Sequence, residues 1–196
     1  MIKVGLTGGI GSGKTFVSKI FKLLGAPVYN SDIEAKKLYT NNIIVKEKII
    51  SNFGSQIYFE NGELNKQKLS EVIFSDKKSL QIINSIIHPA VKENFEMWLK
   101  TVKFPYIIKE AAILFESGAY KYVDKIILVT APEHKRIERV IKRDNLDEKS
   151  VKERINNQLN QSELRKRSDF EIINDEKEMV LDQIIKIHNI LMLKSK

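Results

Sequence analysis

The sequence predicts an α/β fold with a parallel sheet, because short strand-like segments alternate along the chain with segments of helical periodicity. The first pair lies at the start, where apolar residues alternate over residues 2–7 and helical spacing follows from Lys14. Between them runs the glycine-rich stretch "GGIGSG", and Gly25 stands where a glycine typically ends a helix. A strand, a glycine loop and a helix in this order form the beginning of a βαβ unit.

Four further strands are expected, over residues 27–32, 104–111, 124–131 and 170–174. Helical spacing predicts helices over 33–39, over 133–144 with Pro132 as the first helical residue, over the polar segment 145–167 as one helix, and over 180–191. We expect His88 to be extended and Pro89 to open a helix.

Residues 41–103 show amphipathic segments without a strand-turn-strand pattern, which predicts a mainly helical insertion. A chain of 196 residues suits one domain. We expect a nucleotide-binding core made of 1–32, 104–140 and 166–196, a helical insertion over 33–103 and a lid over 141–165.

Composition narrows the class of partner. The 33 Lys and Arg against 25 Asp and Glu give a net charge of +8, which suits nucleic acid, an anionic membrane or a small polyanionic substrate. No basic block or RNA-binding aromatic motif is present, and the apolar runs are far shorter than the roughly 20 residues that cross a bilayer. We therefore expect neither a nucleic-acid nor a membrane partner. The strand at residue 2 leaves no room for a signal peptide, so a cytoplasmic protein is expected.

The glycine stretch matches the phosphate-loop pattern G-x-x-x-x-G-K-[ST], with Gly8, Gly13, Lys14 and Thr15 at the defining positions. In such a loop the backbone N–H groups surround phosphate oxygens, the lysine reaches the β- and γ-phosphates, and the hydroxyl binds Mg²⁺. The strand before it and the helix after it are the context that the motif requires. The sequence therefore predicts a site for ATP with Mg²⁺, and Thr15 as a metal ligand.

The second strand ends at Asp32, on the sheet edge where ligands of parallel sheets bind. A carboxylate there can orient or deprotonate an acceptor hydroxyl, or hold Mg²⁺ through water. The alternative is a structural N-cap of the helix that follows. Next to a phosphate loop, the catalytic role is favoured.

Two other classes of nucleotide-binding protein fit less well. The only Asn-Lys pair, at residues 65–66, lacks the aspartate of the guanine-binding motif N-K-x-D, which argues against a GTPase. A motor-type ATPase needs an acid that closes an apolar strand, whereas Lys109 interrupts one candidate strand and the strand ending at Thr130 has no acid.

Arg136, Arg139 and Arg143 follow at helical spacing and share one face of the expected helix. They form either a solvated basic face or a lid helix that brings arginines over the triphosphate and excludes water. The lid interpretation is slightly favoured.

Taken together, these segments resemble the dephospho-coenzyme A kinase family over nearly the whole chain. The resemblance rests on "GLTGGIGSGKT", "SDIEAKKL", "IIHPAV", "ILFESG", "RVIKRD", "RINNQ" and "SDFEIIN" in this order. It implies a P-loop fold of three α/β/α layers with a five-stranded parallel sheet, a helical substrate-binding insertion and a lid. It also implies transfer from ATP-Mg²⁺ to the ribose 3′-hydroxyl of dephospho-CoA, by a monomer or weak homo-oligomer.

The motif and the resemblance together give three groups of candidate site residues. The catalytic candidates are Asp32, Lys14, Arg139 and Arg143. The ATP-binding candidates are Gly9, Ile10, Gly11, Ser12, Gly13, Lys14, Thr15, Phe16 and Asn174. The substrate-binding candidates are Asp32, Lys36, His88, Leu114, Phe115 and Glu116.

The chain departs from the family pattern at three positions. Asn30 stands where the family commonly has a first aspartate, Lys36 where it has arginine, and Ala112 where it has proline. Asn30 removes a possible second carboxylate, and Lys36 does not bind an anion with the two-pronged geometry of arginine. Another P-loop kinase, for example one for nucleoside monophosphates, and a P-loop ATPase that acts as a regulatory switch are the alternatives.

Overall fold

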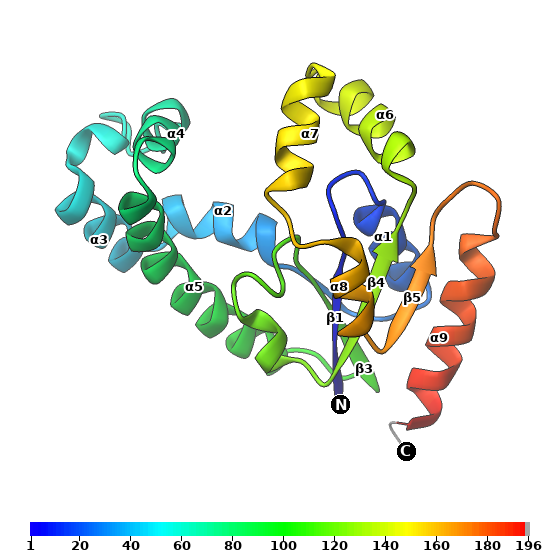
Figure 1. Ribbon diagram of the computed structural model, residues 1–196. Coiled ribbons are helices and arrows are strands. Elements are labelled where there is room, and N and C mark those ends of the chain that lie inside the picture. Colours follow the sequence, from blue (N-terminus) through cyan, green and yellow to red (C-terminus); the bar gives the residue numbers. More distant parts are fainter. Residues whose placement is uncertain (195–196) are drawn as a thin grey trace. The chain divides into compact units, whose positions relative to one another are not determined.

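The computed structural model describes residues 1–194 of the chain, apart from the side chains of Phe74, Ser75 and Lys194. The chain forms two compact units (Figure 1). The core unit consists of Met1–Asn30 together with Lys103–Lys196, and the helical unit consists of Ser31–Val102.

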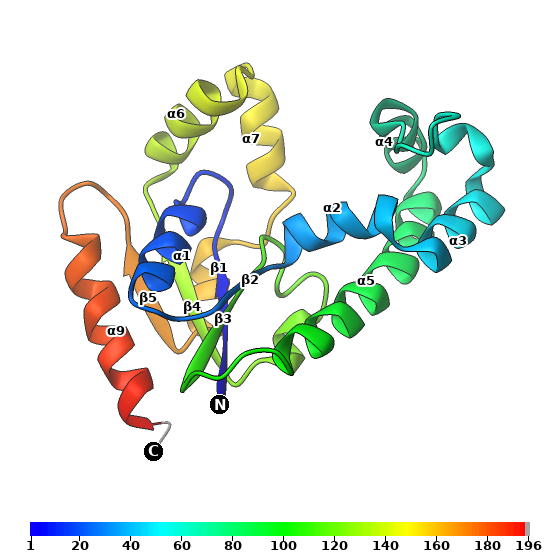
Figure 2. The same cartoon turned by 180° about the vertical axis from the view of Figure 1, so that it is seen from behind.

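The core unit is built on a sheet of five parallel strands within the described residues, in the order β2-β3-β1-β4-β5 (Figure 2). The strands are β1 (Ile2–Thr7), β2 (Val28–Asn30), β3 (Tyr106–Glu110), β4 (Lys125–Thr130) and β5 (Phe170–Ile173). Each lies inside a segment predicted as a strand, and every pairing is parallel. The predicted α/β class with a five-stranded parallel sheet is therefore confirmed.

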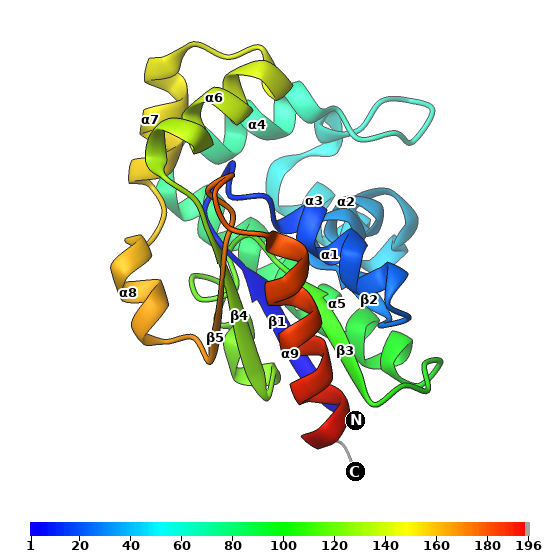
Figure 3. The same ribbon diagram turned by 90° about the vertical axis from the view of Figure 1, so that its right-hand side faces the viewer.

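Helices cover both faces of this sheet. On one face, α1 (Lys14–Leu23) and α9 (Val180–Lys194) enclose a core that contains Phe21, Tyr106 and Ile184. On the other face, the segment after β3, with the short helix η2 (Ala119–Tyr122), and α8 (Gln161–Lys166) pack over Leu128. Figure 3 shows α8 and α9 on opposite sides of β4 and β5. The core unit thus has the three predicted α/β/α layers.

The polar segment 145–167 forms two helices where one was predicted. Helix α6 (Glu133–Asp144) is followed by α7 (Glu148–Asn156), and α8 begins only at Gln161. Side-chain caps explain the break, because Asp147 Oδ1 accepts the N–H of Ser150 at 2.7 Å and Asn160 Oδ1 accepts that of Ser162 at 2.8 Å. Helices α6 and α7 bury a small apolar cluster around Val140 and Val151.

The helical unit has its own core. It consists of α2 (Ser31–Asn41), α3 (Ile43–Phe53), the short helix η1 (Ser55–Ile57), α4 (Lys66–Ser75) and α5 (Lys77–Leu99). Their buried residues form one cluster, which includes Ile49, Ile57 and Ile83. The predicted helical character of this region is confirmed. Among the described residues, no helix has the length and apolarity needed to cross a membrane.

The prediction for His88 and Pro89 is wrong, since both lie inside α5. The helix starts at a cap twelve residues earlier, where the Asp76 side chain accepts the N–H of Lys78. Pro89 removes one helical hydrogen bond, but the buried stripe of Ile83, Ile87 and Phe95 continues on both sides of it. Burial of this stripe holds the helix together through the proline.

Candidate active site

The phosphate loop occupies residues 8–13, between β1 and α1 at the carboxyl edge of the sheet. Ser12 N–H donates to the carbonyl of Gly9 at 3.1 Å, and the N–H groups of Phe16 and Val17 donate to that of Gly13. Gly11 and Gly13 have φ of 78° and 99°, in the left-handed region that favours glycine. The loop therefore has the turn and the helix N-terminus of an anion site.

Lys14, the first residue of α1, points back over this loop. Its Nζ donates to the carbonyl oxygen of Gly8 at 2.6 Å and to that of Gly9 at 3.3 Å. An ammonium group held at this point can reach phosphate oxygens that enter the loop. Phe16, in the first turn of α1, is 54% exposed, so its side chain is open to a ligand.

Thr15 and Ser18 of α1 both donate to one carboxylate, that of Glu110. Thr15 Oγ1 lies 2.8 Å from Glu110 Oε1, and Ser18 Oγ lies 2.8 Å from Oε2. Glu110 is 3% exposed and ends β3, which pairs with β1 so that Leu6 and Glu110 are partners. The predicted metal-binding hydroxyl thus lies beside a buried carboxylate.

Sequence reasoning missed Glu110. The inference that no acid closes an apolar strand was wrong, because Lys109 is itself buried, at 2% exposure, and does not interrupt β3. The signal that could have found it is its position: Glu110 is the last residue of β3, and β3 pairs with β1, the strand before the phosphate loop. Strand neighbours cannot be read from sequence order alone, since β3 is separated from β1 by nearly a hundred residues.

Asn174, directly after β5, supports the loop from another strand. Its Nδ2 donates to the carbonyl oxygen of Ser12 at 2.8 Å, and its own N–H donates to Thr130 at 2.8 Å. The structure therefore brings Asn174 to the phosphate loop. The Ser12 hydroxyl is buried and has no hydrogen-bond partner within the described chain, so the loop keeps an orphaned polar atom.

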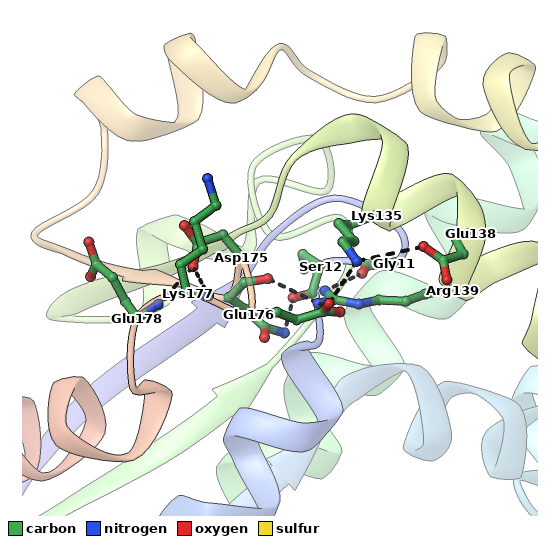
Figure 4. Close-up of polar contacts among 10 residues, drawn as sticks. Gly11, Ser12, Lys135, Glu138, Arg139, Asp175, Glu176, Lys177 and Glu178 are labelled. Atoms are coloured by element: carbon green, nitrogen blue, oxygen red, sulfur yellow. Dashed lines mark hydrogen bonds and ion pairs between the residues drawn. The ribbon is translucent and has the colours of Figure 1, made fainter.

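Arg139 joins α6 to the loop and to the segment after β5. Its Nη1 donates to Gly11 O at 3.4 Å, and its Nη2 donates to Asn174 O at 3.1 Å and Glu176 Oε1 at 3.0 Å. Lys135 binds the same carboxylate at 2.7 Å (Figure 4). The hydrogen bonds from Lys135 and Arg139 hold the pKa of Glu176 below its ordinary range. The predicted lid arginine thus stands at the rim of the phosphate loop.

The three arginines of α6 have different environments. Arg136 is only 6% exposed and donates from Nε to the carbonyl oxygen of Ile10 at 2.9 Å. Arg143 forms an ion pair with the neighbouring Asp144 at 2.7 Å and has a side chain that is 63% exposed. The structure therefore brings Arg136 and Arg139 to the loop and leaves Arg143 outside it. Of the three arginines, only Arg143 lies on a solvated face.

The segment "ILFE" lies on the other face of the sheet. Leu114 is fully buried and Phe115 is 6% exposed, with the Arg167 guanidinium 4.2 Å from the Phe115 ring centroid. Glu116 Oε1 accepts the N–H of Leu159 at 3.4 Å. The Leu114 and Phe115 side chains belong to the core, so their predicted contribution to substrate binding stays a prediction.

Three other candidates lie in the helical unit. Helix α2 begins at Ser31, so Asp32 is its second residue and not its N-cap. Lys36 is exposed on the same helix. His88 is half-buried within α5, and burial lowers the pKa of its imidazole, which favours the neutral form.

Comparisons with known proteins identify the family of this chain. Residues 2–179 match the family model described as dephospho-CoA kinase. A dephospho-CoA kinase from Bacteroides fragilis is 39% identical over 187 residues, which cover 95% of this chain and 91% of that protein.

Two solved structures are similar over nearly their whole length. One is a Thermus thermophilus protein, with a TM-score of 0.85, 28% identity and coverage of 96% of both chains. The other is the dephospho-CoA kinase from Campylobacter jejuni, with a TM-score of 0.71, 25% identity and coverage of 99% and 98%. The chain belongs to the dephospho-CoA kinase family.

Proposed function

We propose that this member of the family transfers the γ-phosphoryl group of ATP to the ribose 3′-hydroxyl of dephospho-CoA and releases CoA and ADP. The family match over residues 2–179 carries the proposal, because it extends far beyond the phosphate loop. The reaction is a phosphotransfer to an alcohol group, the last step of coenzyme A synthesis. The net charge of +8 suits both polyanionic substrates.

The phosphate loop and α1 are proposed to bind the triphosphate. Backbone N–H groups of the loop and the N-terminus of α1 supply positive ends of dipoles, and Lys14 supplies a full charge. Arg139 is proposed to reduce the negative charge that spreads over the transferring group, and its hydrogen bond to Gly11 O at the loop rim supports this role. Arg143 pairs with its neighbour Asp144 on α6, outside the phosphate loop, and its predicted lid role stays a proposal.

Thr15 and Glu110 are proposed to hold Mg²⁺. A hydroxyl and a carboxylate 2.8 Å apart are oxygen ligands of the kind that Mg²⁺ takes beside phosphates, so the residues present fit the ion. Held by Thr15 and Glu110, the ion would neutralise part of the negative charge of the bound triphosphate. Glu110 also holds Ser18, and this second hydrogen bond fixes the orientation of the carboxylate.

Asp32 is proposed to orient and deprotonate the acceptor hydroxyl. It follows the last residue of β2 by two positions, so its Cα stays within about 7 Å of that strand end for any orientation of the helical unit. The strand end, Asn30, pairs with Glu110, which contacts Thr15. This chain connection to the carboxyl end of β2 supports the proposed role of Asp32. Lys36 and His88 are proposed to contact dephospho-CoA.

The test is acceptor-dependent production of ADP. Purified protein with ATP and Mg²⁺ should form ADP rapidly only after addition of dephospho-CoA, with AMP, CMP and shikimate as control acceptors. Phosphorylation of a monophosphate would establish a nucleoside monophosphate kinase instead. Fast hydrolysis without an acceptor would favour an ATPase switch.

Asp32→Asn separates catalysis from nucleotide binding. Loss of the base should lower kcat by about 10²–10⁴-fold, the usual contribution of a general base, and leave the Kd for ATP unchanged. Unchanged turnover would exclude Asp32 as the base, and a matched loss of ATP affinity would make it a binding residue.

A further inference from the structure

Ile10, at the tip of the phosphate loop, has both of its backbone polar groups held by side chains from remote parts of the sequence. Its N–H donates to Gln158 Oε1 at 2.8 Å, across a separation of 148 residues. Its carbonyl oxygen accepts from Arg136 Nε at 2.9 Å, across 126 residues. Ile10 is only partly buried, and backbone groups of surface loops commonly bind water. Two long-range side-chain partners on this one residue therefore indicate a built contact.

The side chain of Ile10 is anchored in the same place. It packs against the buried cluster of Ile137, Val140 and Val151, which belongs to α6 and α7. The loop tip is therefore attached to the α6–α7 pair by one apolar contact and two hydrogen bonds.

Arg136 also explains why glycines, Gly9 and Gly11, stand on either side of Ile10. A methyl group added at Gly9 would collide with the Arg136 guanidinium, and one added at Gly11 would collide with the Arg136 backbone. Arg136 is 6% exposed, so it has little room to move aside. Gly9 thus makes space for an arginine of the protein itself.

Gln158 follows the C-cap residue of α7, Asn157. Its N–H donates to the carbonyl oxygen of Ile155 at 3.1 Å, and Ile155 packs against the same apolar cluster as Ile10. A displacement of α7 would therefore carry Gln158, and with it the hydrogen bond to the loop tip.

We propose that Gln158 and Arg136 are positioning residues for ATP, which hold the loop tip in its phosphate-binding shape and couple it to α6–α7. Without them, the loop occupies its binding shape for a smaller fraction of the time. The apparent Kd for nucleotide then rises in proportion. The proposal rests on the proposed function only for the nature of the donor, a nucleotide, and not for the acceptor.

The first experiment replaces the glutamine acceptor by a side chain of similar length, in Gln158→Met. Calorimetric titration with ADP and with a non-hydrolysable ATP analogue should show a Kd raised about tenfold, the effect of one hydrogen bond of ~1.4 kcal/mol. KM for dephospho-CoA should stay unchanged. Gln161→Met, the same replacement at the first residue of α8, is the matched control and should bind nucleotide normally.

An unchanged nucleotide Kd with a lower Tm would overturn the proposal, because Gln158 would then serve stability alone. Nucleotide binding is measured without any acceptor, so the result stands even if dephospho-CoA proves to be the wrong substrate.

The second experiment is a double-mutant cycle of Gln158→Met with Arg136→Lys. Both residues act through Ile10. Once one of them is replaced, replacing the other should therefore raise the nucleotide Kd clearly less than it does in the wild type. Additive effects on the nucleotide Kd would contradict a shared action. If Arg136→Lys fails to fold, Ile10→Ala takes its place in the cycle, with the same expected non-additivity.

Discussion

The two edges of the sheet both carry long-range polar contacts, but the contacts differ in what they hold. At the amino edge, Tyr106 Oη and His188 Nδ1 share a hydrogen bond of 2.6 Å, and Asp169 Oδ2 accepts the N–H of Ile126 at 2.8 Å. These bonds join the starts of strands to their neighbours. At the carboxyl edge, side chains of Asn174 and Gln158 hold the backbone of one glycine loop.

This difference separates stability from function within one unit. Polar groups at the amino edge satisfy one another in pairs, so they need no ligand. At the carboxyl edge, cations, a carboxylate and amides converge on a loop that keeps the orphaned Ser12 hydroxyl. The functional site is therefore recognised by polar side chains that converge on the backbone of the phosphate loop. Buried polar groups alone, which both edges have, do not identify it. Substitutions at the two edges should therefore affect different measurements.

The largest effect is expected from Glu110→Gln at the carboxyl edge. The amide keeps the shape of the side chain and removes the charge that is proposed to hold Mg²⁺. Turnover should fall about 100-fold, and the Mg²⁺ concentration for half-maximal rate should rise, as expected for a residue that tunes a metal site. Glu171→Gln, on the edge strand, is the control and should leave both quantities unchanged. An unaltered Mg²⁺ dependence would remove Glu110 from the metal site.

Gly9→Ala should produce a smaller effect at the same edge. The added methyl group meets the Arg136 guanidinium, and overpacking of this kind costs about 1–3 kcal/mol, which should raise KM for ATP roughly tenfold. Arg136→Gln should partly restore ATP binding when combined with Gly9→Ala, since it frees the space. If the double variant is worse than both single variants, the glycine is required by the nucleotide and not by the arginine.

At the amino edge, Tyr106→Phe should change stability and not activity. Tyr106 is fully buried, so loss of its hydroxyl leaves His188 without this hydrogen bond and costs about 1 kcal/mol. In a chain of this size, Tm should fall by about 2–4 °C, and kcat and both KM values should be unchanged. A reduced kcat at unchanged Tm would contradict the assignment of stability to the amino edge and function to the carboxyl edge.

The smallest effect is expected from the ion pair of Arg165 and Glu171. Two hydrogen bonds of 2.7 Å from Arg165 hold the pKa of Glu171 below its ordinary value of 4.5. The stabilisation is fully present above that ordinary value and is lost as the pH falls through the folded-state pKa.

Arg165→Gln should therefore lower the free energy of unfolding at pH 7 by less than about 1 kcal/mol, because the Arg165 side chain is 55% exposed and water screens the pair. The difference from the wild type should shrink at an acid pH below the ordinary glutamate value of 4.5. Urea unfolding at both pH values measures it, and a difference that grows in acid would contradict this assignment.

Local pattern predicted much of this structure. The five strands were found as short strand-like segments between segments of helical spacing, and Gly25, with φ of 89°, ends α1 as expected. The loop residues Lys14 and Thr15 were found because the motif is contiguous and needs no knowledge of tertiary contacts. Predictions failed where a local signal competes with packing, as at Pro89, whose helix is maintained by buried residues on both sides.

By itself, the sequence determined the order of the elements, the phosphate loop and the resemblance to a family of kinases, because each depends on neighbouring residues or on their order. Only the tertiary structure decided that Glu110 meets Thr15, that Arg136 is buried against the loop tip while Arg143 is not, and that Gln158 reaches Ile10. These contacts join residues from about 95 to 148 positions apart. Strand order and helix packing create them, and a one-dimensional pattern contains neither.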